Sequence, residues 1–287
     1  MIFKGLKRPV SLAIAASLLA VPAAGSLAQE PVNSSVQSVS YADIADLADA
    51  SEVVIRAQIR KQIEVEPERS PGLAPGHVRL FIEARTLSLI SGPAAVGESL
   101  RYLVDVPRDS KGRAPKLRKQ EVLLFARLVP GRPGELRLVR PEAQLAYSAE
   151  LEARARPIIA ALVAADSPPV VTGVRDALSV PGNLVGESET QIFLETADRS
   201  PVSLTVLHRP GREPSWGVSW GEIIDQAARP PQRDTIAWYR LACALPGRLP
   251  SSANLSRDPA SRSAAERDYA LVLGSLGPCM RTLARAD

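Results

Sequence analysis

The sequence predicts an α+β protein in two parts, and three observations carry that prediction. Between residues 41 and 146, apolar and polar residues alternate with a period of two in one segment after another, which is typical of antiparallel strands with one face in a core. After residue 147, helical stretches frame three short strand-like segments separated by turn residues. We therefore expect a five-stranded antiparallel β domain over 41–146. A smaller α+β domain should follow over 147–287, with a three-stranded meander and C-terminal helices.

The first domain should begin with a short helix at 41–50. Ser40 can cap its first turn, and Asp43 places a carboxylate near the positive end of the helix dipole. The alternating pattern then predicts five strands, at 55–65, 78–90, 100–106, 121–129 and 136–138.

The second domain should begin with a helix at 148–165 that contains Pro157. Ser167-Pro-Pro-Val170 is interpreted as the start of a second helix that ends at Leu178, because proline is tolerated in a first turn. The remaining elements are expected as strands at 190–196, 201–208 and 215–220, and helices at 235–245 and 263–276. Ser263 and Glu266 have capping-box spacing, and Gly277-Pro278 should end the last helix.

The N-terminus predicts export. Lys4, Lys7 and Arg8 precede an apolar run and a small-residue stretch that ends at Ala28, which are the three parts of a secretory signal. We expect residues 1–28 to be removed and 29–40 to form a flexible leader on a periplasmic or secreted protein. No later apolar run reaches the 18 residues that a membrane-spanning helix needs, so no transmembrane segment is expected in the mature chain.

Charge argues against nucleic acid as a partner. The formal net charge of +4 falls to +1 once the three basic residues of the signal are removed, whereas nucleic-acid-binding domains concentrate basic residues on one face. The loop at 107–119 is the exception. Its six basic residues, against one acid, are a possible anion-binding site: Arg108, Lys111, Arg113, Lys116, Arg118 and Lys119. We expect this loop to be disordered on its own. Its partner would be an unknown protein or an anionic envelope component such as a phospholipid headgroup; a solvated hairpin tip is the alternative.

The two cysteines, Cys243 and Cys279, both lie in the exported part of the chain. An even number of cysteines in an oxidising compartment favours a disulfide. We expect this bond to join the two C-terminal helices.

The motifs of catalysis and metal binding argue against most enzyme classes. Gly217-Val-Ser-Trp-Gly221 fits the G-x-S-x-G pattern, but no histidine follows Ser219 and the preceding residues are not those of a central strand. The two histidines, His77 and His208, lack the spacing of zinc ligands. We therefore predict no catalytic residue, no metal site and no cofactor. A periplasmic hydrolase with dispersed carboxylates stays open as the alternative, because acids about 5–10 Å apart in space leave no sequence spacing.

Two stretches of the first domain, Ala48–Arg56 and Leu89–Gly92, resemble OB-like barrels, including the inhibitory domain of tissue inhibitors of metalloproteinases. That resemblance implies a five-stranded β-barrel. It does not imply inhibition, because the N-terminal cysteine with which those inhibitors chelate metal is missing. Residues 186–196, 216–225 and 235–243 resemble a family of exported alphaproteobacterial proteins, which implies a location and no activity. The expected function is a non-catalytic envelope binding or interaction protein.

Overall fold

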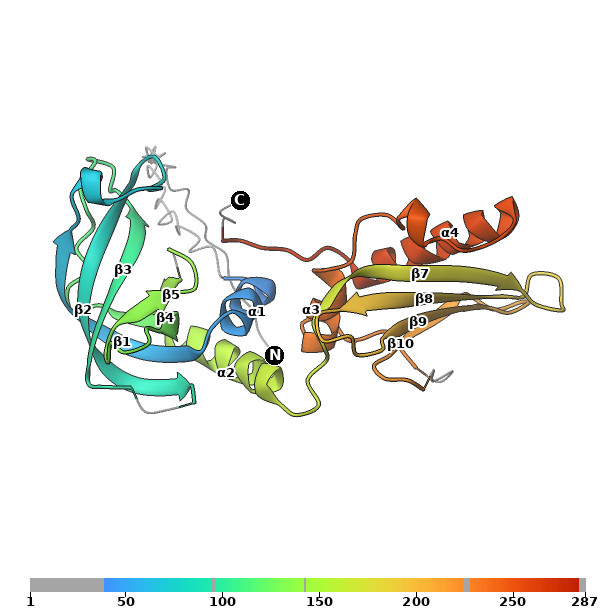
Figure 1. Ribbon diagram of the computed structural model, residues 1–287, viewed down its shortest axis with the longest axis horizontal. Helices are drawn as coiled ribbons and strands as arrows, with labels where there is room; N and C mark the ends of the chain where they lie inside the picture. Colours follow the sequence, from blue (N-terminus) through green and yellow to red (C-terminus); the bar gives the residue numbers. More distant parts are fainter. Residues whose placement is uncertain (1–38, 94–95, 142, 224–227, 284–287) are drawn as a thin grey trace, which may run out of the picture. The chain divides into compact units, whose positions relative to one another are not determined.

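A computed structural model describes residues 39–93, 96–141, 143–223 and 228–283. The predicted signal peptide and all but the last two residues of the predicted leader lie outside these ranges. Residues 37–287 form one compact unit, and the predicted division near residue 146 stays a prediction. Within the described ranges the fold is α+β, with two antiparallel sheets and four α-helices (Figure 1).

The first sheet contains six strands, and its order is β3-β2-β1-β4-β5 with β6 paired to β4. Their bounds are β1 (Val53–Glu64), β2 (His77–Ser91), β3 (Ser99–Pro107), β4 (Glu121–Leu128), β5 (Leu136–Leu138) and β6 (Gln144–Ala146). The first five lie where the alternating pattern predicted them. The sequence pattern did not predict β6. The described strands do not form a closed barrel, so the predicted OB-like barrel is not confirmed.

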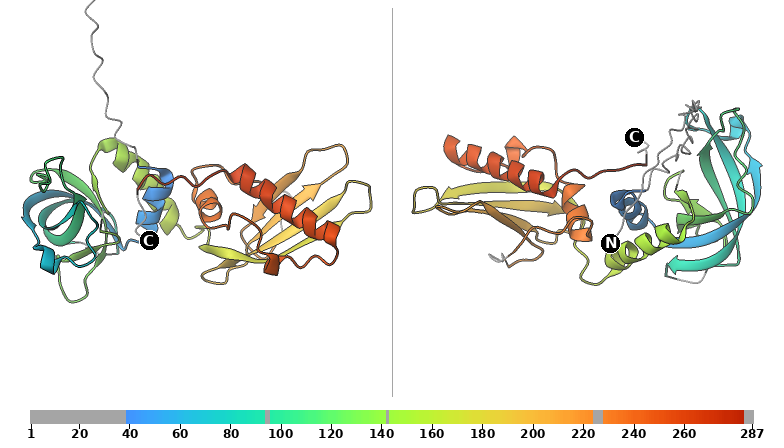
Figure 2. Two further views of the ribbon diagram at one scale, coloured as in Figure 1. Left: turned by 90° about the horizontal axis from the view of Figure 1, so that it is seen from above. Right: turned by 180° about the vertical axis from the view of Figure 1, so that it is seen from behind.

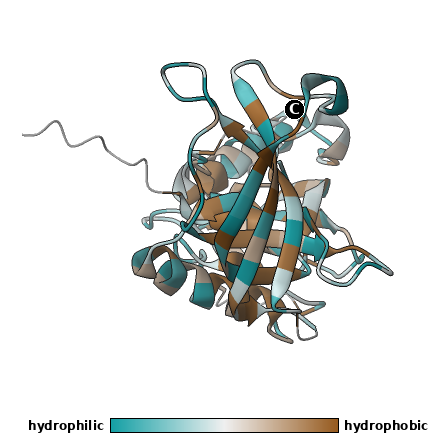
Figure 3. Cartoon of the chain, turned by 90° about the vertical axis from the view of Figure 1, so that its left-hand side faces the viewer, coloured by the Kyte–Doolittle hydropathy of each residue, from teal (hydrophilic) through white to brown (hydrophobic). Residues whose placement is uncertain are grey.

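Alternation explains how this sheet buries one face. Along β2 the buried side chains are Val78, Leu80, Ile82 and Ala84, and the residues between them are only partly covered. Figure 3 shows hydrophilic and hydrophobic residues alternating along the strands on this side of the molecule. In β4 the run from Val122 to Ala126 is buried throughout, as the nearly continuous apolar sequence requires of a central strand.

Two helices belong to this half of the chain, α1 (Tyr41–Asp49) and α2 (Ala149–Val163), and they contact each other. Ser40 caps α1 as expected: its hydroxyl accepts a hydrogen bond from the Asp43 N–H, and the Asp43 carboxylate accepts one from the Ser40 N–H. A short 3₁₀ turn, η1 (Pro67–Arg69), lies in the loop after β1.

The second sheet contains four strands in the order β10-β9-β8-β7. Their bounds are β7 (Val171–Pro181), β8 (Ser188–Thr196), β9 (Ser203–His208) and β10 (Ser215–Ser219). The strands β8, β9 and β10 lie where the three-stranded meander was predicted, but the sheet has a fourth strand, β7, beside β8. The helix α4 (Pro259–Leu276) lies along one face of this sheet and contacts β7 and β8 (Figures 1 and 2). The helix α3 (Ile236–Ala242) and the 3₁₀ turn η2 (Ser251–Ala253) complete the described elements.

The predicted helix from Ser167 to Leu178 is wrong, because most of this stretch belongs to β7. Val171 to Pro181 pairs antiparallel with β8 through register shifts at Thr172 and Arg175. These shifts break the strict alternation that would have identified a strand. The segment is rich in valine, and β-branched residues favour an extended chain over a helix once a neighbouring strand is available.

The predicted start of the last helix is also wrong. Asp258 caps α4 by accepting a hydrogen bond from the Ser261 N–H at 2.9 Å, so Ser263 lies inside the helix. Gly277 ends α4 as predicted, with φ of 68° in the left-handed region that favours glycine.

Cys243 and Cys279 form the predicted disulfide, with their Cα atoms 5.1 Å apart. Cys243 follows directly after α3, and Cys279 follows the Gly277-Pro278 break after α4. Nearby, the Trp238 indole N–H donates to the Leu276 carbonyl at 2.8 Å. The helix α3 and the C-terminal end of α4 are therefore held together by one covalent bond and one buried hydrogen bond. Of the helices described, none has the length and apolar content to cross a membrane.

Candidate functional site

The basic loop between β3 and β4 is held in a defined conformation. The Gln62 side chain, on β1, accepts a hydrogen bond from the Leu117 N–H at 2.6 Å and donates one to the Pro115 carbonyl at 2.8 Å. The Lys119 N–H donates to the Ile59 carbonyl at 2.8 Å, and Leu117 packs against the core. The prediction that this loop is disordered is wrong, because its composition does not reveal the Gln62 contacts or the anchoring leucine.

The six basic residues of this loop fall into two groups. Arg108 pairs with Glu64 at 2.6 Å, and Arg113 pairs with Asp109 at 3.1 Å. The other four are exposed and form no ion pair with any residue that the structure describes; we call them the basic loop surface: Lys111, Lys116, Arg118 and Lys119. The sequence alone does not show that the charges of Arg108 and Arg113 are compensated by neighbouring acids.

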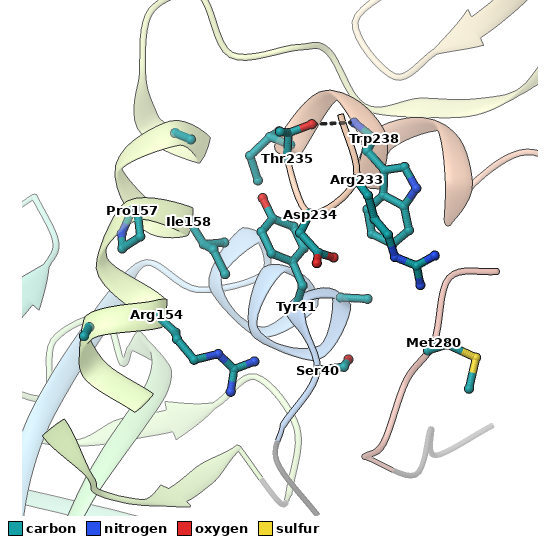
Figure 4. Close-up of a pocket in the computed structure, with 14 residues that line it drawn as sticks. Ser40, Tyr41, Arg154, Pro157, Ile158, Arg233, Asp234, Thr235, Trp238 and Met280 are labelled. Carbon is teal, nitrogen blue, oxygen red and sulfur yellow. Dashed lines mark hydrogen bonds between the residues drawn. The ribbon is translucent and has the colours of Figure 1, made fainter. Parts of the chain in front are cut away.

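A cavity of about 740 Å³ is the second candidate site (Figure 4). One wall is a stripe of α2 side chains at helical spacing, formed by Ala153, Pro157, Ile158 and Ala161. Arg154, also on α2, lies in the lining as well. The other walls come from the start of α1, from α3 with the residues that lead into it, and from Met280: Ser40, Tyr41, Ala42, Arg233, Asp234, Thr235, Ile236 and Trp238 complete the lining.

Helix capping fixes the aromatic part of the cavity. Ser40 caps α1 directly before Tyr41, and Thr235 caps α3 by accepting a hydrogen bond from the Trp238 N–H at 3.2 Å. The rings of Tyr41 and Trp238 pack edge to face with centroids 6.2 Å apart. The two caps thus hold both rings in place at the cavity.

Three charged side chains line the cavity, and none of them forms an ion pair within the part of the chain that is described. Arg154 donates to the Val39 carbonyl at 2.6 Å, and Arg233 lies over the Trp238 ring at 5.4 Å. Asp234 forms no side-chain hydrogen bond to the described residues. Burial, together with the negative charge of Asp234, raises the pKa of Tyr41 to about 12, so its hydroxyl keeps its proton at neutral pH.

A buried polar cluster lies under α4 in the second sheet. The Asp268 carboxylate is only 3% exposed, and its Oδ1 lies 2.6 Å from the His208 Nε2. Its Oδ2 accepts a hydrogen bond from the Thr190 hydroxyl, which lies 2.9 Å from Ser179 Oγ. No local sequence pattern indicates this cluster, because His208 and Asp268 are 60 residues apart and belong to different elements. Its partners satisfy a buried carboxylate on the helix.

The serine of the G-x-S-x-G pattern is a strand residue. Ser219 is buried at the end of β10, where it pairs with Ser203 of β9, and no strand-to-helix turn follows in the described residues. A nucleophile elbow requires that turn. Among the described residues, no group of three or more His, Cys, Asp or Glu side chains is placed to hold a metal ion.

Comparison with models of known protein families finds no match, and no curated protein sequence matches the chain.

Proposed function

We propose that this protein is a non-catalytic binding protein of the bacterial cell envelope, which acts in the periplasm or outside the cell after its signal peptide is removed. Its partner is an anionic envelope component, bound through the basic loop surface. One observation carries this proposal: four exposed cations, without acidic partners among the described residues, lie on a loop that is fixed by hydrogen bonds and an apolar anchor.

An ordered loop is better suited to bind an anion than a disordered one. A loop whose backbone is already fixed loses less conformational entropy when it binds, so more of the electrostatic attraction contributes to affinity. Each Lys or Arg near an anionic lipid surface contributes about 1 kcal/mol at moderate salt. Four such residues would give a weak but measurable attachment that salt weakens.

Two further observations support the envelope location and the OB-like fold. The disulfide is typical of compartments outside the cytoplasm. The first five strands run in the order β3-β2-β1-β4-β5, and a single parallel bridge joins Arg101 of β3 to Glu135, the residue before β5. A β3 edge that approaches β5 in this way is what a partly closed OB-like barrel needs. The resemblance to exported alphaproteobacterial proteins is consistent with a location in the cell envelope. The hydrolase alternative stays a prediction.

The test is flotation with lipid vesicles at low salt, comparing vesicles with anionic headgroups and vesicles of phosphatidylcholine alone. We expect binding to the anionic vesicles only. Replacement of the basic loop surface (K111Q/K116Q/R118Q/K119Q) should weaken binding by up to about three orders of magnitude.

A matched control removes four exposed arginines that lie in other parts of the chain and form no ion pair with the residues described in the structure: R85Q/R137Q/R212Q/R267Q. This variant has the same net charge as the loop variant, so net charge alone would affect both equally. Equal loss of binding in the two variants, or no binding to either vesicle, would contradict the proposal.

A further inference from the structure

We infer that the cavity lined by α2, Tyr41 and the start of α3 binds a small zwitterion with an apolar body, which is the chemistry of apolar amino acids and short apolar peptides. This inference is independent of the basic loop surface, because the two sites share no residue. It depends on the charges, the apolar walls and the size of the cavity.

The charges favour a ligand that carries both signs. Arg154 and Arg233 supply guanidinium groups, which match a carboxylate in geometry and charge. Asp234 supplies a carboxylate that can accept hydrogen bonds from an ammonium group. Because Arg233 and Asp234 form no ion pair within the described chain, both charges are available to a ligand. A purely anionic amphiphile would provide no positive charge for the Asp234 carboxylate and would be repelled by it.

The backbone conformation at residue 234 does not by itself require a carboxylate side chain. Its φ is 58°, in the left-handed region that Asp and Asn adopt more readily than other residues with a side chain. Asparagine would meet that requirement equally well. The negative charge therefore has no role in the backbone conformation, and Asp234→Asn removes the charge while keeping a residue suited to the turn.

The apolar walls suit the body of such a ligand. Pro157 and Ile158 present aliphatic surface, and the Tyr41 and Trp238 rings lie across the cavity from α2 (Figure 4). The neutral Tyr41 hydroxyl can donate or accept a hydrogen bond without adding charge. A volume of about 740 Å³ falls within the range of small-molecule sites, which are mostly apolar with a few placed polar groups.

The experiment is calorimetric titration of the full exported chain with trileucine, compared with N-acetyl-trileucine and trileucine amide. We expect the free peptide to bind and each blocked form to bind about tenfold to hundredfold more weakly, because each lacks one charged hydrogen bond. Asp234→Asn should weaken binding of the free peptide but leave the acetylated peptide unchanged. Arg233→Gln should weaken the free peptide but leave the amide unchanged.

The control is Arg85→Gln, which removes an exposed arginine on β2 that is not ion-paired within the described ranges. It should leave all three affinities unchanged. Circular dichroism of each variant checks that the fold is retained. Equal affinity for the free and blocked peptides would overturn the inference, as would dodecanoate binding without trileucine binding. The absence of any binding heat at millimolar peptide would overturn it as well.

Discussion

Asp43 and Asp268 are carboxylates buried in the protein, and each receives hydrogen bonds from residues that are distant in sequence. Asp43 Oδ2 accepts from the Thr282 N–H at 2.8 Å and from the Thr282 hydroxyl at 2.7 Å. Asp268 is contacted by His208 and Thr190. A buried charge is costly unless it is hydrogen-bonded, so these contacts fix which segments pack together.

Asp43→Asn should destabilise the protein by about 1–3 kcal/mol at neutral pH, because the hydrogen bonds from Thr282 and Ser40 lose their charged acceptor. Burial alone would raise the pKa of Asp43, but the hydrogen bonds from Thr282 and Ser40 outweigh it and lower the pKa below its usual value. A lowered folded-state pKa means that this stabilisation is present above about pH 4 and is lost as the pH falls through the folded-state value.

Urea unfolding at several pH values measures this effect. The difference between wild type and Asp43→Asn should be full at pH 7 and should shrink as the pH falls below 4. Equal stability of the two proteins at pH 7 would show that the Thr282 contacts contribute nothing.

His208→Gln should also destabilise the protein by about 1–3 kcal/mol, because the buried Asp268 loses a hydrogen-bond partner. The chain offers a matched control, since His77 is its other histidine and, among the described residues, its ring hydrogen-bonds only with the exposed Pro75 carbonyl, at 3.1 Å. His77→Gln should change the unfolding free energy by less than about 0.5 kcal/mol. Thermal unfolding compares the two variants directly, and equal effects would contradict a specific role for the Asp268 contact.

Among the elements, those with regular alternation were predictable and those with irregular pairing were not. The pattern in β2 identified its buried face residue by residue, because every second side chain enters the core. In β7 the register shifts at Thr172 and Arg175 hid the strand, and Ser167-Pro-Pro was mistaken for a helix start. The local sequence does not show whether an irregular segment can still pair with a neighbouring strand through β-bulges.

The candidate sites were predictable only where one segment forms them. The basic loop could be identified because its six cations lie close together in one segment of the sequence. Its ordered conformation, however, depends on Gln62, which lies 55 residues before Leu117. The cavity combines residues near 40, 154 and 234, and no local pattern links these three positions. The disulfide was predictable because two cysteines allow one pairing.

The order of the basic loop depends on Gln62, so Gln62→Ala should lower the unfolding free energy by about 1–2 kcal/mol. Trypsin should also cleave after Lys116 or Arg118 faster, because the loop opens more often. Gln58, on the same strand, is the control, since its amide reaches the Lys119 carbonyl only at 3.4 Å. Gln58→Ala should have a smaller effect on both measurements. Unchanged cleavage in Gln62→Ala would show that other contacts order the loop.

At the scale of the whole molecule, the disulfide closes a long loop between α3 and the segment after α4. Cys243 and Cys279 are 36 residues apart, and a loop of this length should contribute about 4 kcal/mol by restricting the unfolded chain. C243S/C279S should therefore lower the unfolding free energy by up to that amount. Maleimide labelling of the denatured, unreduced wild type should modify neither thiol. Labelling of both would show that the bond does not form in the native envelope.

The acidic face of α1 connects the first half of the chain to the last. Asp43, Asp46 and Asp49 recur every third residue and so lie on one side of the helix. Asp46 pairs with Arg281 at 2.6 Å and accepts a hydrogen bond from the Tyr239 hydroxyl at 2.7 Å. Asp49 pairs with Arg240, also at 2.6 Å.

We expect these contacts to make the two sheets unfold together, so scanning calorimetry of the wild type should show one transition. D46N/D49N should separate it into two, because Arg240 is 7% exposed and its charge would lose its partner in a buried position. D176N/D198N is the control, since it removes two acids that lie in the second sheet and its turns and make only local contacts. That variant should keep one transition. A single transition in D46N/D49N at the wild-type temperature would show that apolar packing alone couples the halves.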